Sequence, residues 1–235
     1  MASKRIRIPK ASDLVVSEIR EKIFFERLPV GTRLPSESEL MEQFGLGRVS
    51  VREALRILER DGLIDIRRGA RGGVFVRHTD ISQVSDALAL LLRFRESTLG
   101  EAAEYRLLME PPIAELAASN ATDEQRAAFR KIADNVRHKD TAELHRITAE
   151  ACGNSVFEMM IQALHNSHFG HHRYDVMSAG QPDGAQEHKR IALAIAEGDG
   201  QAASEAMREH IVNYREYLRA KSLETMWTMP NRVIR

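Results

Sequence analysis

Apolar residues recur at helical spacing in three short segments of the first 61 residues, and turn residues separate these segments. Ser12 and Asp13, residues that often cap helices, precede the first segment. Ser36 and Glu39 have capping-box spacing before the second, and the third runs over residues 48–61. The apolar positions are Leu14, Val15, Ile19, Ile23 and Phe24; Leu40, Met41 and Phe44; and Val51, Ala54, Leu55 and Leu58. The pattern therefore predicts three helices.

The spacing of apolar residues changes after Gly62. Residues 63–66 and 74–76 read as two short strands around a basic, glycine-rich loop at 67–73. A tight Gly45–Gly47 turn separates the second and third predicted helices. Two helices, a tight turn, a third helix and a hairpin form the order of a winged helix-turn-helix, which we predict for this part.

Beyond residue 80 only helical spacing is found, and no strand pattern or internal repeat appears. The predicted helices cover residues 81–96, 99–119, 123–136, 141–152, 154–177, 185–197 and 199–220. Pro111 and Pro112 fall inside the second of these spans, where we expect them to interrupt and kink the helix. The predicted fold is thus mostly α: a winged helix-turn-helix at residues 1–78 and an all-α helical bundle at residues 79–235.

Charge divides at the same place. The whole chain holds 34 Lys and Arg against 34 Asp and Glu, which alone would argue against a nucleic-acid partner. The first 78 residues, however, hold 16 basic and 11 acidic residues, a net charge of +5, and the remainder carries −5. This asymmetry is typical of a nucleic-acid-binding part joined to another domain.

Composition limits the class of protein further. The single cysteine, Cys152, excludes an internal disulfide and the common cysteine sets of zinc fingers. The strongly apolar run at residues 87–92 is far too short to cross a membrane, and the first residues lead into no apolar stretch of signal-peptide length. We expect a cytoplasmic protein without a membrane partner.

Basic residues mark the chemistry of the first domain. Arg48, Ser50 and Arg52 lie near the start of the third predicted helix, where a recognition helix meets base edges and phosphates. Arg67, Arg68 and Arg71 lie on the hairpin loop, which can approach phosphates or the minor groove. Double-stranded DNA is the predicted partner, and a merely solvated basic surface is the alternative.

The first domain resembles the DNA-binding domain of the GntR family of bacterial transcription regulators. The matching residues are 34–37, Leu40, 48–55, Leu58 and 62–64, with the spacing preserved. By position, the resemblance implies DNA contacts at Arg48, Ser50 and Arg52, and at Arg68 and Gly69 of the wing tip.

Three further positions complete this expected DNA-binding set. Ser38 stands where some family members use an Arg to reach DNA, so that contact is weakened or absent here. Val49 replaces a small polar residue of many members and either touches a thymine methyl group or packs. Arg33 is either a phosphate contact or part of a structural ion pair.

Residues 81–218 resemble the all-helical effector domain, called FCD, of the FadR subfamily within this family. Three segments carry the resemblance: residues 104–106 with Glu110, Ala114 and 116–118; residues 144–145 with 153–154; and residues 187–188 through 210–211. The resemblance implies an effector site that includes Arg106, His145, Asn154, His188 and His210.

The resemblance also implies a divalent metal, of which zinc fits best, held by His145, His188 and His210. The family's fourth ligand is an Asp one helical turn before the first histidine, and Thr141 occupies that position here. Two interpretations stay open: a metal whose shell is completed by water or an effector carboxylate, and a metal-free pocket whose histidines bind an anionic effector directly.

The roles of Arg106 and of four further histidines also have more than one interpretation. Arg106 is expected to pair with an effector carboxylate, and an i, i+4 ion pair with Glu110 is the alternative. A set of further histidines, His165, His168, His171 and His172, is particular to this chain; we expect them to be solvated, with a cavity lining or a second metal site as alternatives.

These features predict a ligand-responsive transcription regulator, more often a repressor in this family, that reads a pseudo-palindromic operator as a homodimer. The expected effector is a small carboxylate, with a fatty acyl-CoA bound without metal as the second choice. An architectural DNA-binding protein without ligand is the alternative from another class. A metal-dependent hydrolase is disfavoured because no HExxH-type motif or nucleophile elbow is present, so we expect no enzyme.

Overall fold

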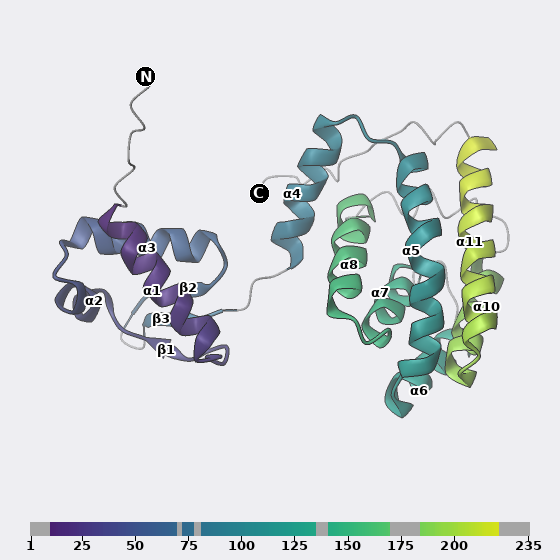
Figure 1. The fold of residues 1–235 in the computed structure, drawn as a ribbon, viewed down its shortest axis with the longest axis horizontal. Coiled ribbons are helices and arrows are strands. Elements are labelled where there is room, and N and C mark those ends of the chain that lie inside the picture. Colours follow the sequence, from purple (N-terminus) through teal and green to yellow (C-terminus); the bar gives the residue numbers. More distant parts are fainter. Residues whose placement is uncertain (1–9, 70–71, 78–80, 135–140, 170–183, 221–235) are drawn as a thin grey trace, which may run out of the picture. The chain divides into compact units, whose positions relative to one another are not determined.

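The computed structural model describes residues 10–69, 72–77, 81–134, 141–169 and 184–220. Contacts divide the chain into two compact units, Met1–Asp80 and Ile81–Arg235. The first combines helices with a small sheet, and the described part of the second is helical (Figure 1).

The first unit is a winged helix-turn-helix. Its elements are α1 (Ala11–Phe25), β1 (Arg33–Leu34), α2 (Glu37–Phe44), α3 (Arg48–Arg60), β2 (Ile64–Arg67) and β3 (Gly73–Val76). Apolar residues of α1, α2, α3 and the strands share one core, to which Leu40 and Leu58 contribute almost fully buried side chains. The capping box predicted for α2 is confirmed, because Ser36 N donates to Glu39 Oε2 at 2.6 Å and Glu39 N donates to Ser36 Oγ at 3.3 Å.

Details of α1 differ from the prediction. Asp13 lies inside the helix rather than before it, and its carboxylate accepts a hydrogen bond from Lys10 N at 3.0 Å. Leu14 and Phe24 were expected on the buried side, but their exposed fractions are 58% and 61%. The buried face is made instead by residues such as Val15 and Ile19, which contact the core of the unit.

The sheet has three antiparallel strands in the order β1-β3-β2. Strand β1 was not predicted, because two residues are too few to show an alternating pattern. It pairs Arg33 with Phe75 and Leu34 with Val74, and it buries Leu34. The two predicted strands form the wing.

The second unit contains seven described helices: α4 (Ile81–Phe94), α5 (Leu99–Asn120), α6 (Asp123–Asp134), α7 (Thr141–Ala151), α8 (Ser155–Phe169), α10 (Gly184–Glu197) and α11 (Gly200–Ala220). The long helices α5 and α11 lie side by side, and α10 packs against both and against α6 (Figure 1). Helix α7 contacts α5 and α8, and α4 packs on α8. None of the described helices is long and apolar enough to cross a membrane.

The predicted interruption of α5 is wrong, since Pro111 and Pro112 lie within one continuous helix. Each proline removes a backbone N–H, so the carbonyls of Leu107 and Leu108 lose their usual helical donor. The residues that follow, among them Ile113 and Ala117, are buried in the core. We infer that this packing keeps the segment helical despite the two prolines.

Arg126 of α6 connects the carboxyl-terminal ends of two helices. Its Nη2 donates to Ala118 O of α5 at 2.8 Å, and its Nη1 donates to Ile195 O and Ala196 O of α10 at 3.1 and 3.3 Å. Helix ends of this kind carry partial negative charge and unpaired carbonyls. One cation therefore satisfies the ends of both helices.

Candidate functional site

The amino-terminal half of α3 presents polar and basic side chains to solvent. Its buried face is made by residues with helical spacing, including Val51 and Leu55. The opposite face exposes Arg48 and Arg52, one turn apart, with side-chain exposed fractions of 71% and 58%. Val49, 84% exposed, does not pack inside the protein. Of the two interpretations of Val49, intramolecular packing is therefore excluded.

Glu37, the first residue of α2, lies between these two arginines. Its Oε1 is 3.2 Å from Arg48 Nε, and its Oε2 is 3.9 Å from Arg52 Nε. Glu37 could not be identified as functional from the sequence, because the contact joins two helices. The capping box was the available signal, since it places Glu37 at the first position of α2.

The remaining predicted DNA-binding residues lie around this face. Ser50 is half-buried near the start of α3, and Ser38 is exposed on α2 with its Oγ 3.1 Å from Ser36 Oγ. Arg33 is exposed on β1 and forms no ion pair with any carboxylate of the described residues. The pKa of Glu39 is nevertheless lowered by its hydrogen bonds with Ser36 and also by the charge of Arg33, so both interpretations of Arg33 stay open.

Arg68 and Gly69 lie at the tip of the wing. Both are exposed, and Gly69 has φ +98°, a conformation that favours glycine. Arg71 lies outside the described residues. An open groove of about 340 Å³ separates α3 from the wing, and its basic lining comes from Arg52, Arg56, Arg67 and Arg68.

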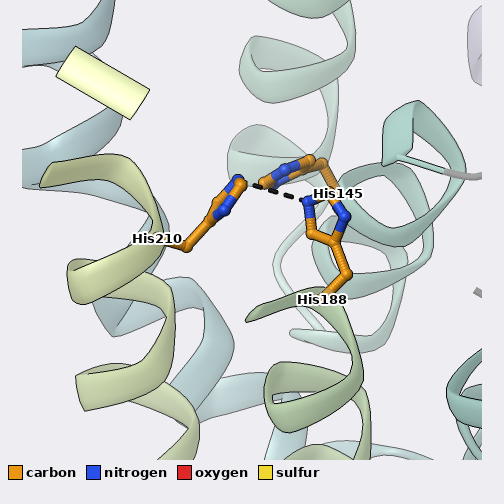
Figure 2. A group of neighbouring side chains, drawn as sticks. All are labelled: His145, His188 and His210. Atoms are coloured by element: carbon orange, nitrogen blue, oxygen red, sulfur yellow. Dashed lines mark hydrogen bonds between the residues drawn. The ribbon is translucent and has the colours of Figure 1, made fainter. Parts of the chain in front are cut away.

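A second constellation is buried in the helical unit, where three histidines meet from three helices. His145 comes from α7, His188 from α10 and His210 from α11, and their rings point toward one another (Figure 2). His188 Nε2 is 3.2 Å from His210 Nε2, and the ring centroids of His145 and His210 are 5.3 Å apart. One ring nitrogen from each lies within 4.8 Å of the others.

Two buried carboxylates stand behind these histidines. Glu187 Oε2 accepts a hydrogen bond from His210 Nδ1 at 2.7 Å, and Asn213 Nδ2 donates to Glu187 Oε1 at 2.6 Å. Glu110 Oε2 lies 2.6 Å from His145 Nδ1. Glu187 belongs to a segment that carries the family resemblance, and its position next to His188 is the signal in the sequence that could have assigned it a role.

Arg106 makes the ion pair that the sequence left as its alternative. Its Nε lies 2.6 Å from Glu110 Oε1, and both side chains are buried. The same guanidinium group also reaches the histidines, because Nη2 lies 3.2 Å from His145 Nε2. Arg106 thus belongs to the buried constellation, whether or not it contacts an effector.

His165 is buried, so the expectation that it is solvated is wrong. Its Nε2 lies 3.0 Å from Glu110 Oε1, and its ring centroid is 5.0 Å from that of His145. His171 and His172 lie outside the described residues, as does the side chain of His168. Asn154 is exposed at the start of α8, where its Oδ1 accepts a hydrogen bond from Val156 N at 3.0 Å, and it is not part of the buried group.

Burial favours the neutral imidazole at three histidines of this buried group, His145, His165 and His188. Burial lowers the pKa of His145 to about 3, although Glu110 opposes the shift, and burial also lowers the pKa of His188 and His165. Burial alone would raise the pKa of Glu110, but Arg106 and His145 outweigh it and hold that pKa well below its usual value. Neutral imidazole is the form that binds metals.

Two of the three histidines have the spacing that a tetrahedral metal ion requires. Zinc–nitrogen bonds of about 2.0–2.1 Å place two ligand nitrogens about 3.3 Å apart, close to the His188–His210 separation of 3.2 Å. His188 Nδ1 has no hydrogen-bond partner among the described residues. Ligation through His145 Nε2 would require Arg106 to move away. The side chain of Thr141, at the start of α7, is outside the described set, and Glu110, His145 and His165 form a second group of possible ligands.

Comparisons with known proteins give a family match for each of the two units. Residues 11–76 match the family described as bacterial regulatory proteins, gntR family, and residues 101–213 match the FCD domain. The chain is 32% identical over 225 residues to the HTH-type transcriptional repressor NanR of Klebsiella aerogenes, which covers 86% of this chain and 83% of that protein. NanR of Enterobacter sp. is 31% identical over the same shares.

Among solved structures, Streptococcus agalactiae GntR is similar with a TM-score of 0.61 and 26% identity, over 87% of this chain and 99% of that one. The relatives are regulators rather than enzymes. The chain therefore belongs to the gntR family of bacterial regulatory proteins and is a DNA-binding transcription regulator that carries an FCD effector domain.

Proposed function

We propose that the protein is a ligand-responsive transcriptional repressor in which residues 1–78 bind a pseudo-palindromic operator and residues 79–235 bind the effector and form a homodimer. The observation that carries the DNA-binding role is the exposure of Arg48 and Arg52 on one face of α3, opposite its buried apolar face. The name of the relatives, transcriptional repressor, supports the direction of control. Two-fold symmetry would give each recognition helix one half-site.

The proposed DNA contacts divide by chemistry. Arg48 and Arg52 read base edges, with Ser50 and Val49 beside them on α3. Arg33, Ser38, Arg68 and Gly69 face the sugar-phosphate backbone from β1, α2 and the wing, and they position the domain without reading sequence.

We propose a small carboxylate as the effector, held at the buried centre of His145, His188 and His210 with Arg106 beside it. Zinc is the metal that this donor set fits best, and as a Lewis acid it would bind the effector carboxylate. A hydrogen bond to Glu187 fixes the ring of His210 before a ligand arrives, and the Glu110 carboxylate lies 2.6 Å from His145 Nδ1. Arg106 offers a cation next to the same nitrogens.

Fatty acyl-CoA binding without metal is the second candidate. Arg106 supports it, because its Nη2 already occupies the space at His145 Nε2 that a metal ion would need. Metal analysis of the purified protein, together with a thermal-shift screen of carboxylates and acyl-CoAs, separates the two candidates.

The proposed function is tested with DNA selected from a random duplex library by the protein itself. A carboxylate found in the screen should change the affinity for this DNA, and His188→Ala should abolish the response while leaving DNA binding intact. Arg190→Ala, on the exposed side of the same helix, serves as the control. DNA binding without sequence preference would favour an architectural protein, and an unaltered response in His188→Ala would overturn the proposed effector site.

A further inference from the structure

Glu37 is one of two acidic residues, with Glu59, in a groove whose other charged residues are arginines. It lines the groove between α3 and the wing together with Arg52, Arg67 and Arg68. A carboxylate at a surface for phosphates repels the ligand, so its presence calls for an explanation. Helix capping is not that explanation, because Glu39 already closes the capping box with Ser36.

Glu37 lies in the first turn of α2, where the helix dipole favours an acidic residue, but its ion pairs with the arginines add little to stability. Its two ion pairs involve arginine side chains that are 71% and 58% exposed, and exposed pairs contribute little to folding. The pairs place one carboxylate beside two long, flexible side chains and so favour particular directions for them. Arg48 and Arg52 both approach Glu37 through Nε, one at each carboxylate oxygen.

The use of Nε has a consequence for DNA recognition. The terminal Nη nitrogens carry four of the five guanidinium N–H groups, and such groups form the bidentate contact with guanine. An arginine that reads a base edge can therefore keep its Glu37 contact. An arginine that swings away from Glu37 to reach a phosphate gives up this contact and leaves the carboxylate unpaired.

We propose that Glu37 is a specificity-determining positioning residue, which holds Arg48 and Arg52 in the base-reading orientation and penalises binding to non-specific DNA. This inference rests on the proposed DNA contacts of the two arginines. It adds a distinct property: part of the sequence discrimination comes from a residue whose charge opposes DNA binding.

Glu37→Gln tests the proposal, because it keeps the size of the side chain and removes its charge. Affinities are measured for the selected operator and for a duplex of equal length with scrambled half-sites, over a range of salt concentrations. Non-specific affinity should rise several-fold, operator affinity should stay equal or fall, and the ratio should drop about tenfold. The slope of log affinity against log salt concentration for non-specific DNA should become more negative, by the amount that corresponds to about one additional phosphate contact.

Two further variants distinguish the positioning of the arginines by Glu37 from the general repulsion between any surface carboxylate and DNA. Glu53→Gln removes an exposed carboxylate of α3 that has no ion pair among the described residues, and it should leave the ratio of affinities nearly unchanged. Glu37→Asp keeps the charge but shortens the reach, so it should weaken operator binding without raising non-specific affinity.

Equal changes of both affinities in Glu37→Gln, or the same loss of ratio in Glu53→Gln, would overturn the inference. Loss of folding would lower both affinities together and is monitored by circular dichroism. If Arg48→Ala leaves operator affinity unchanged, the proposed DNA contacts fail instead, so the two failures are distinguishable.

Discussion

The carboxylate of Glu187 lies 2.7 Å from Nδ1 of His210, so the hydrogen bond turns Nε2 of that ring toward His188. A carboxylate behind a ligating histidine fixes the tautomer and orientation of the ring and makes it a better ligand. We expect Glu187→Gln to weaken zinc binding about 10–100-fold. Competition with a zinc-sensitive dye measures the affinity, and an unchanged value would show that His210 does not ligate the ion.

Removal of metal should lower the thermal stability of the protein. An ion that binds only the folded state stabilises it by about 2.7 kcal/mol at a free concentration 100 times its dissociation constant. Zinc added after chelation should therefore raise the unfolding temperature, which differential scanning fluorimetry records. His210→Ala should show no such rise, and an equal rise in this variant would place the ion elsewhere.

Loss of Arg48 or Arg52 of α3 should lower the affinity for the operator. A bidentate arginine–base contact contributes about 1–3 kcal/mol of discrimination, so Arg48→Ala or Arg52→Ala should weaken operator binding roughly tenfold or more. Gel-shift titration with the selected DNA measures the loss. Arg60→Ala, which removes an exposed arginine at the other end of α3, is the matched control and should bind nearly as the unaltered protein does.

The wing should not tolerate a side chain at residue 72. A Cβ there would meet backbone atoms, among them Gly69 O at 2.8 Å and the carbonyl oxygen of Arg67. Gly72→Ala should therefore distort the wing tip and weaken DNA binding, while circular dichroism shows the helices intact. Gly47→Ala is the control for stability, because nothing lies within 4 Å of a Cβ at that residue and its φ of −70° suits any side chain. Full DNA affinity in Gly72→Ala would mean that the wing makes no contact.

Arg126→Ala should destabilise the helical unit by about 2–3 kcal/mol, because several carbonyls lose a charged donor. Chemical denaturation measures the free energy of unfolding. Arg190→Ala, which breaks only the exposed ion pair with Glu209, should change it by less than about 1 kcal/mol. A similar loss in both variants would contradict the role given to Arg126.

Helix α2 could be predicted closely, because it has both an apolar face and a clear end signal, the capping box of Ser36 and Glu39. Strand β1 could not, since two residues form no period and its pairing partner Phe75 lies far along the chain. Likewise, family motifs pointed to the three histidines, but the burial of His165 and its contact with Glu110 depend on how α8 packs. Spacing along one helix carries no information about contacts of this kind.

The hydrogen bonds of Arg126 also bear on how a signal could leave the histidine centre. They join the carboxyl-terminal ends of α5 and α10 through one side chain, so these ends are the least free to separate. The opposite end of α5, near Leu99, instead packs against Tyr214 and Leu218 of α11 and follows directly after α4. A ligand at His188 or His210 therefore meets two differently held ends of α5: one joined to α10 by a charged side chain, and one held by apolar packing against α11.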